Sequence, residues 1–308
     1  MIQMQSTALT PPTLDALLLT TCDMQGGRTD ELLRLLDSIS QQVQVDGVRV
    51  VHYVLLQRAD PQAPALATDW VQHDLRFLSL PGRVSLSRAR NLMLHQVELD
   101  GVLSSARWLA FPDDDAWYPP GFIRRITTLF LSAPHVGMAT CQYASTPTAV
   151  ATTPNSGAFE VLTSSAEFVR TVSSNTLFLR ADIARSVGFF DERLGVGAPI
   201  NGGEDLDFAL RAFTLNTGKT LISRLPLVGH RDRQVWIRST YFGGGLFALA
   251  RAARGDTRLW WPFVRKMLVG IFLFAKGELK PPQLMASIRC ALKGFAHRTP
   301  LVEEITAP

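Results

Sequence analysis

The length of 308 residues fits one large domain with an appendage, or two domains, and with 46% apolar and 19% charged residues the chain is globular with a sizeable core. Its three cysteines are odd in number and far apart, which excludes a disulfide framework or a zinc cluster and indicates a reducing compartment. The net charge of +4 is uneven: from Val235 onward there are 11 Lys and Arg against 4 acidic residues, and before it 20 against 23. This basic, aromatic tail predicts an anionic surface as partner.

The first twelve residues carry no charge, so they lack the basic start of a signal peptide and also its apolar core. No apolar run approaches the roughly 20 residues that span a bilayer, and the longest run of interest, 267–275, has about half that length. We therefore expect a cytoplasmic protein, attached at most peripherally to the inner face of the cytoplasmic membrane.

In the first half of the chain, apolar runs alternate with segments of helical periodicity. Strands are expected over 14–21, 48–56, 75–80 and 107–111. A loop, 22–28, follows the first strand, and Thr29 is expected to cap the helix after it, with Asp30 and Glu31 in the first turn. A further helix is expected over 85–97. This alternation predicts the α/β class, with a mainly parallel sheet and helices on both faces.

In the second half, a short strand is expected over 176–179, and helices are expected over 122–131, 181–187 and 204–215. Segment 195–203 has four glycines and a proline, which predicts a mobile loop before the last of these helices. After His230 only helices are expected. We therefore predict an amino-terminal tail (1–13), an α/β domain (14–234) and a helical extension (235–308).

Three consecutive carboxylates, Asp113, Asp114 and Asp115, directly follow the predicted strand 107–111. Ligands of parallel sheets bind beyond the carboxyl ends of the strands, where this cluster lies. A hard divalent cation, which takes oxygen ligands, usually compensates such repulsion, and an Asp-x-Asp pair can hold a metal that holds a diphosphate. The alternative is a solvated turn, because Asp is common in turns.

Two glycines, Gly202 and Gly203, free the backbone before the predicted helix 204–215, whose first turn holds Glu204 and Asp205. A carboxylate kept ionised at a helix start suits a general base, and we assign that role to Asp205. For Glu204 and Asp207, plain capping is an equally good interpretation.

His230 follows an apolar segment, and an imidazole can complete a metal site begun by carboxylates, although a lone His is more often structural. Arg231 and Arg233 either neutralise a diphosphate or form a solvated charged turn. Arg90 and Asn91 either lie near a nucleotide, with the amino terminus of helix 85–97 facing phosphate oxygens, or belong to a surface helix start.

Taken together, these segments resemble family 2 glycosyltransferases of the GT-A fold, and among them bacterial rhamnosyl- and galactosyl-type transferases of surface glycan assembly. The matching pieces occur in the family's order over about 14–233: Thr20-Thr21-Cys22-Asp23, Ala89-Arg90-Asn91, Asp113-Asp114-Asp115, 187–192, Glu204-Asp205 and His230. The chain departs from the family at the turn that reads the base, where Gln57 or Asp60 would substitute for the usual acidic pair. It also departs in the first loop, where Thr20 and Cys22 line the edge.

The resemblance implies an inverting, metal-dependent hexosyl transfer from a UDP-, dTDP- or GDP-sugar to a glycan or lipid-linked glycan such as O-antigen or capsule, with no nucleic-acid partner. Asp205 would deprotonate the acceptor hydroxyl. Mn²⁺ or Mg²⁺ would be held by Asp113, Asp115 and His230. The nucleotide-sugar would contact a larger polar set: Thr21, Asp23, Gln57, Arg90, Asn91, Asp113, Asp114, Glu204 and Arg231.

Two other functions fit the same residues. A nucleotidyltransferase also uses a strand-end aspartate pair, but it releases pyrophosphate. A non-catalytic module of this fold would only bind glycan or tether partners, although the presence of Asp113, Asp115 and Asp205 argues against it.

The tail segment 259–276 combines aromatic, apolar and basic residues, with Pro262 suited to a helix's first turn. Such a helix either lies in the interface of an anionic membrane or packs its apolar side on the catalytic domain.

Overall fold

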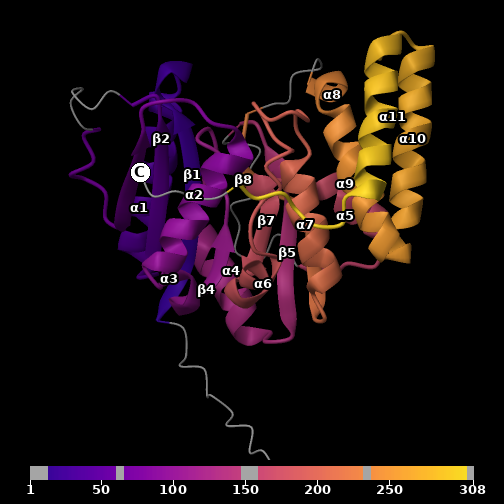
Figure 1. Ribbon diagram of the computed structural model, residues 1–308. Coiled ribbons are helices and arrows are strands. Elements are labelled where there is room, and N and C mark those ends of the chain that lie inside the picture. The colour runs from indigo at the N-terminus through magenta and orange to yellow at the C-terminus, as the bar shows by residue number, and fades with distance from the viewer. Residues whose placement is uncertain (1–12, 60–65, 147–158, 232–236, 304–308) are drawn as a thin grey trace, which may run out of the picture.

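The computed structural model describes residues 13–59, 66–146, 159–231 and 237–303. These residues build a mixed sheet of eight strands (Figure 1). In spatial order the strands are β3 (Asp74–Leu80), β2 (Val50–Gln57), β1 (Leu14–Asp23), β4 (Ala106–Ala110), β7 (Leu177–Arg180), β5 (Val136–Ala144), β8 (Lys219–Gly229) and β6 (Glu160–Val161).

The strand directions confirm the predicted mainly parallel sheet. β1 is parallel to β2 and β4, β2 to β3, and β5 to β8. β7 is antiparallel to both β4 and β5, so β5 runs in the same direction as β4, and β6 is antiparallel to β8. The carboxyl ends of β1, β2, β4 and β8 therefore lie at one edge of the sheet, where ligands of such folds bind.

Side chains of β1 alternate between the two faces of the sheet, and helices cover both faces. Ala16 and Leu18 share a core cluster with α1 (Thr29–Asp46) and α4 (Phe122–Ser132). Leu17 and Leu19 share the other main cluster with five further helices: α2 (Leu86–Leu99), α3 (Val102–Ser105), α5 (Ser165–Thr171), α6 (Ala181–Val187) and α7 (Glu204–Leu215).

The carboxyl-terminal helices join this core through α9 (Phe242–Gly255), which follows the short α8 (Ile237–Thr240). α9 packs on α7. On its other side it contacts a hairpin of α10 (Trp260–Ala275) and α11 (Pro281–Ala296), which forms one flank of the molecule (Figure 1). A 3₁₀ turn, η4 (Thr257–Leu259), leads into α10. Among the described helices, none combines the length and the apolar character needed to cross a membrane.

A buried ionic cluster fixes α9 against the α/β core. Nη1 of Arg251 lies 2.5 Å from Oδ2 of Asp191, and Nη2 of Arg251 pairs with Asp207 of α7. The side chain of Arg251 is 6% exposed. Because buried charges are costly unless they are paired, these contacts hold the extension in one position relative to α7.

Most predicted elements are present, with boundaries that differ by at most two residues. The prediction for Thr29 is wrong: Arg28 occupies the capping position without a side-chain cap bond, and Thr29 is the first helical residue. The loop predicted at 22–28 begins later, because β1 continues through Asp23 and a 3₁₀ turn, η1 (Met24–Gly26), follows.

Among the described α-helices and strands, five were not predicted: α3, β5, β6, α5 and β8. Strands β5 and β8 are buried over most of their length, so their side chains do not alternate between polar and apolar. Pro226 within β8 also argues against a strand when only the sequence is considered.

Candidate active site

The acidic cluster and His230 meet at the carboxyl edge of the sheet, although β4 and β8, which they follow, are not neighbours. A bridge between Trp117 and Gly229 joins the aspartate loop to the end of β8. Trp117 N donates to Gly229 O at 3.2 Å, and Gly229 N donates to Trp117 O at 2.9 Å. Glycine is required at position 229, because a Cβ there would lie 1.8 Å from Cε2 of Trp117.

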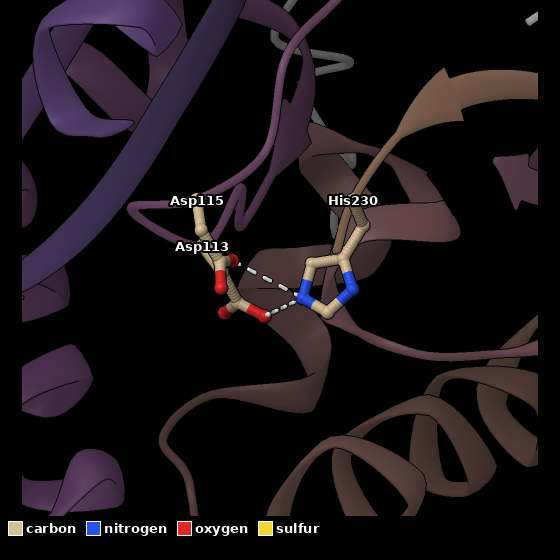
Figure 2. A group of neighbouring side chains, drawn as sticks. All are labelled: Asp113, Asp115 and His230. Atoms are coloured by element: carbon tan, nitrogen blue, oxygen red, sulfur yellow. Dashed lines mark ion pairs between the residues drawn. The ribbon is translucent and has the colours of Figure 1, made fainter. Parts of the chain in front are cut away.

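The imidazole of His230 faces the carboxylates of Asp113 and Asp115 (Figure 2). Nε2 of His230 lies 3.2 Å from Oδ1 of Asp115 and 3.6 Å from Oδ2 of Asp113. One ligand atom from each residue lies within 4.8 Å of the other two. The three residues that the sequence indicated as metal ligands are therefore neighbours in space.

Cationic side chains of the protein balance the carboxylates of Asp113 and Asp115. Burial raises the pKa of Asp113 and of Asp115, but the neighbouring cations together outweigh burial and lower both pKa values: His230 with Arg90 at Asp113, and His230 with Arg231 at Asp115. Burial also lowers the pKa of His230, and the two carboxylates raise it more strongly, to about 9. Arg231 adds a further cation, with Nε 2.6 Å from Oδ2 of Asp115.

The three side chains fit a divalent metal ion. Two carboxylates and one imidazole match the ligands of Mn²⁺, and the carboxylate oxygens match those of Mg²⁺. Both oxygens of Asp115 are buried and, within the described residues, have no hydrogen-bond partner of good geometry, although cationic groups lie close. Buried polar atoms normally have such partners, so oxygens left in this way are suited to metal coordination.

A turn that the sequence did not reveal holds Asp113 from the other side. It is the 3₁₀ segment η3 (Ser174–Thr176), which precedes β7. Asn175 accepts a hydrogen bond from Asp113 N at 2.7 Å and donates Nδ2 to Oδ2 of Asp113 at 3.0 Å. Oγ of Ser174 lies 3.2 Å from Oδ1 of Asp113. The only sequence sign of this turn is a run of four polar residues directly before an apolar strand.

Asp205, in the first turn of α7, faces the acidic edge. The guanidinium of Arg90 pairs with both carboxylates: Nη1 with Asp205, and Nη2 with Oδ1 of Asp113 at 3.3 Å. Ser174 forms a second bridge, since its N donates to Oδ2 of Asp205 at 3.3 Å while its Oγ contacts Asp113. Burial lowers the pKa of Arg90, but the two carboxylates raise it overall, so the bridging guanidinium stays charged.

Glu204 differs from its neighbour Asp205 in exposure, since Glu204 is only 6% exposed. Burial and the charge of Asp205 raise the pKa of Glu204 to about 8, against the lowering effect of Arg90. Glu204 is therefore mostly protonated at neutral pH, which makes it a poor general base. Asp207, also in the first turn, pairs with Arg211 at 3.0 Å and with Arg251, which supports the structural interpretation of this residue.

The loop before α7 is pressed against the first turn of α9. A Cβ on Gly203 would lie 2.3 Å from C of Gly244, and a Cβ on Gly244 would lie 2.1 Å from O of Gly202. Gly203 also has a φ of +86°. The glycines at 243–245 show no phosphate-loop pattern in the sequence. Gly244 is explained by close packing, which allows α9 to contact the turn just before Asp205.

Two arginines near the start of α1 line the same edge. Nη1 of Arg28 lies 2.9 Å from Oδ1 of Asp114, whose pKa is raised by burial to about 6 in spite of this cation. Nη2 of Arg34 donates to O of Asp115 at 2.7 Å, and its guanidinium lies 4.5 Å from the centre of the Trp117 ring. The sequence did not single out either arginine, because basic residues are common on amphipathic helices.

The predicted nucleotide contacts on β1 and β2 form a second group at this edge. Nε of Arg58 donates to Oδ1 of Asp23 at 2.8 Å. Gln57 donates to Oγ1 of Thr21 at 3.0 Å and accepts from Val84 N at 2.8 Å. Arg58, which was not predicted, has a φ of +52°, the only positive value at a non-glycine residue in the described ranges.

Asn91 is fully buried, and its amide is engaged with the protein. It donates to O of Phe190 at 3.0 Å and to Oε1 of Glu192 at 2.7 Å, and it accepts from Phe190 N at 2.7 Å. These bonds fix the turn at 190–192, and a nucleotide contact of Asn91 stays a prediction. Asp60 and Arg233 lie outside the described residues.

Solved structures of similar shape include TarS and a mannosyltransferase. Residues 1–349 of TarS from S. aureus, in complex with UDP-GlcNAc, match with a TM-score of 0.64 at 13% identity over 92% of this chain and 82% of that chain. Full TarS matches with a TM-score of 0.63 at 13% identity over 91% of this chain and 49% of that chain. The mannosyltransferase PcManGT from Pyrobaculum calidifontis, in complex with GDP-Man and Mn²⁺, gives a TM-score of 0.54 at 14% identity over 93% and 89%.

The likeness to these structures shows that the chain has the GT-A fold. No protein-family model matches the sequence, and a search of curated proteins finds no match either.

Proposed function

We propose that the protein is a metal-dependent glycosyltransferase that moves a sugar from a nucleotide-diphosphate donor to a hydroxyl of a glycan or lipid-linked glycan. The observation that carries the proposal is the position of Asp205, which shares the guanidinium of Arg90 with Asp113. A candidate base and a candidate metal site are thus one side chain apart, as transfer between two bound sugars requires. The GT-A fold and the nucleotide-sugar complexes of TarS and PcManGT support the proposal.

In the proposed reaction, the acceptor hydroxyl gives its proton to Asp205 while its oxygen bonds to the anomeric carbon. The bond from that carbon to the diphosphate oxygen breaks, and attack from the opposite face inverts the anomeric configuration. Mn²⁺ or Mg²⁺ held by Asp113, Asp115 and His230 would neutralise charge on the leaving nucleoside diphosphate. Arg231 lies beside the same carboxylates and adds positive charge there.

For the donor, we propose a UDP-, dTDP- or GDP-linked hexose of the rhamnosyl or galactosyl type. Its nucleoside would lie over the ends of β1 and β2, against Thr21, Asp23 and Gln57, because the carboxyl ends of these strands lie at the same edge as the acidic cluster. For the acceptor, we propose a growing surface glycan on a lipid carrier at the inner face of the cytoplasmic membrane.

A thermal-shift panel with Mn²⁺ tests this function against its rivals. We expect a nucleoside diphosphate and its sugar conjugate to raise Tm, because a ligand that binds only the folded state stabilises it. The stabilising sugar nucleotide should then release nucleoside diphosphate in a reaction that EDTA stops. Preference for a triphosphate, with release of pyrophosphate, would indicate nucleotidyl transfer instead. No response to any nucleotide would favour a non-catalytic binding module.

A further inference from the structure

The hairpin of α10 and α11 exposes a dense group of apolar side chains. Eighteen large apolar residues are exposed in the described part of the chain, and ten of them belong to this hairpin. Those ten are Trp260, Trp261, Val264, Leu268, Val269, Ile271, Phe272, Phe274, Met285 and Leu292. Single exposed apolar residues are normal on a protein surface, whereas a contiguous group marks an interaction site.

Many of these residues share one side of α10. Trp261, Val264, Leu268, Ile271 and Phe272 recur at intervals of three and four residues, so they form one stripe along the helix. Packing on the rest of the protein accounts for the opposite side of α10, but not for this outer stripe.

The inner side of α10 is closely packed. The Phe263 ring lies 5.2 Å from that of Phe295 on α11. A Cβ on Gly270 would lie 2.8 Å from Cε1 of Phe242 on α9. The hairpin therefore has a fixed inner face, and its outer stripe is a second, separate apolar surface.

The hairpin that carries the outer stripe is rich in exposed cations. Residues 260–296 contain six Lys and Arg but a single acidic residue, Glu278. Five of the six cations are exposed: Arg265, Lys276, Lys280, Arg289 and Lys293. Nζ of Lys276 lies 4.8 Å from the centre of the Phe272 ring, so this positive charge lies directly beside the apolar stripe.

We propose that the α10–α11 hairpin is the docking surface of this protein for an anionic lipid bilayer. The apolar stripe would enter the boundary between headgroups and acyl chains, and the surrounding cations would meet lipid phosphates. Two tryptophans at one end of α10 suit this boundary, because indole has an apolar body and a polar N–H. Attachment through such a helix is peripheral.

A second copy of the chain is a poorer occupant of this face. Two identical faces would place Arg265 and Lys276 of one copy near the same cations of the other, with only Glu278 available to compensate them. An anionic headgroup layer provides the missing negative charge over the whole face. The complementary charge therefore selects a lipid surface rather than self-association.

The docking surface deepens the proposed function. The purpose of membrane docking, which is to reach lipid-linked acceptors, rests on that function. α9 connects the hairpin to the loop that starts α7, through the close contact of Gly244 with Gly202 and Gly203. A hairpin held at a bilayer would thus keep the site with Asp205 at a fixed position relative to lipid-linked acceptors.

Vesicle flotation of the full chain tests the inference. Phosphatidylcholine vesicles are compared with vesicles in which about one third of the lipid is phosphatidylglycerol, and we expect at least about tenfold stronger binding to the anionic ones, weakening with salt. The double variant L268Q/F272Q should lose at least about tenfold of this binding. The matched control L99Q/L131Q changes two apolar residues that are 67% and 52% exposed on other helices, and it should bind like the wild type.

Absent binding to anionic vesicles, or an equal loss in the control, would overturn the inference. A dimer in light scattering that L268Q/F272Q abolishes, without vesicle binding, would identify a second copy as the occupant instead. The thermal shift with Mn²⁺ and nucleoside diphosphate is measured on the same proteins and should not change in L268Q/F272Q. Its failure in the wild type would contradict the proposed transfer reaction and leave the docking result intact.

Discussion

The acidic edge of the sheet, with Asp113, Asp115 and Asp205, buries charged side chains, whereas the α10–α11 hairpin exposes apolar ones. At the edge, charged groups are buried: Asp115 and Arg90 are each 2% exposed, and each meets an opposite charge from another part of the chain. On the hairpin, apolar groups are exposed, such as Trp261 at 61% and Phe272 at 56%. Both arrangements lower the stability of the isolated chain relative to a conventional core and surface.

The two regions differ in what relieves this cost. The chain itself supplies countercharges at the acidic edge, so the charged groups there are balanced without an external surface. The apolar stripe of α10 has no such internal partner among the described residues, and only an external surface can cover it. Changes at the edge should therefore be visible with soluble protein alone, whereas changes on the stripe should be visible only with a partner.

The largest effect on the edge is expected from D205N. The amide cannot accept the acceptor proton, so transfer should fall by about 10²- to 10⁴-fold while donor binding remains. Turnover is measured as release of nucleoside diphosphate in the presence of acceptor. The matched control is D182N, an exposed carboxylate in the first turn of α6, which should act like the wild type. Near-normal turnover of D205N would remove Asp205 from the role of base.

D115A should remove the metal-dependent part of nucleotide affinity, by about 100-fold, because the substitution deletes a buried oxygen ligand. Titration calorimetry of UDP and GDP, with and without Mn²⁺, measures it. The adjacent variant D114N keeps an oxygen for Arg28 and should retain the response to Mn²⁺. The same Mn²⁺ dependence in D115A and the wild type would contradict the metal assignment.

R251M tests the junction between the two regions. The substitution leaves the carboxylates of Asp191 and Asp207 with fewer cations in a buried place, which should lower the free energy of unfolding by about 3 kcal/mol. Urea denaturation measures the change. R265M on the exposed side of α10 should cost less than about 0.5 kcal/mol. Similar small losses in both variants would mean that the extension is not fixed to α7 through this cluster.

Local sequence was sufficient to single out the carboxylates of the edge one by one. Three carboxylates after an apolar strand indicated Asp113 and Asp115, and two glycines before a helix indicated Asp205. Their mutual arrangement depends on the strand order, in which β7 is the neighbour of β4 and is followed by β5 and then β8. The contact of η3 with Asp113 could not be predicted for that reason.

The hairpin shows the reverse relation between sequence and structure. Its composition left two alternatives for the helix, which either lies in a membrane interface or packs its apolar side on the catalytic domain, and composition could not decide between them. The position of α9 decides this, since Phe242 of α9 contacts Gly270 and leaves the side of Leu268 uncovered. That position in turn depends on glycines at 243–245, whose close packing has no recognisable sequence pattern.

The smallest effect is expected from E204Q, which sharpens the distinction between Glu204 and Asp205 at the edge. The pKa of Glu204 rises from 4.5 to about 8 in the folded protein, so between these values the folded state keeps a proton that the unfolded state has released. Stability therefore falls as pH rises through this window. E204Q does not titrate, so its free energy of unfolding relative to the wild type should improve by about 2 kcal/mol between about pH 6 and pH 8.

Urea denaturation at the two pH values measures the change, with E98Q on the exposed end of α2 as the control. If E204Q and the wild type instead responded equally to pH, Glu204 would be ionised beside Asp205 in the folded protein. Glu204 would then be a third charged carboxylate near the guanidinium of Arg90, which already pairs with Asp205 and Asp113. The choice of Asp205 over Glu204 as base would in that case rest on exposure alone.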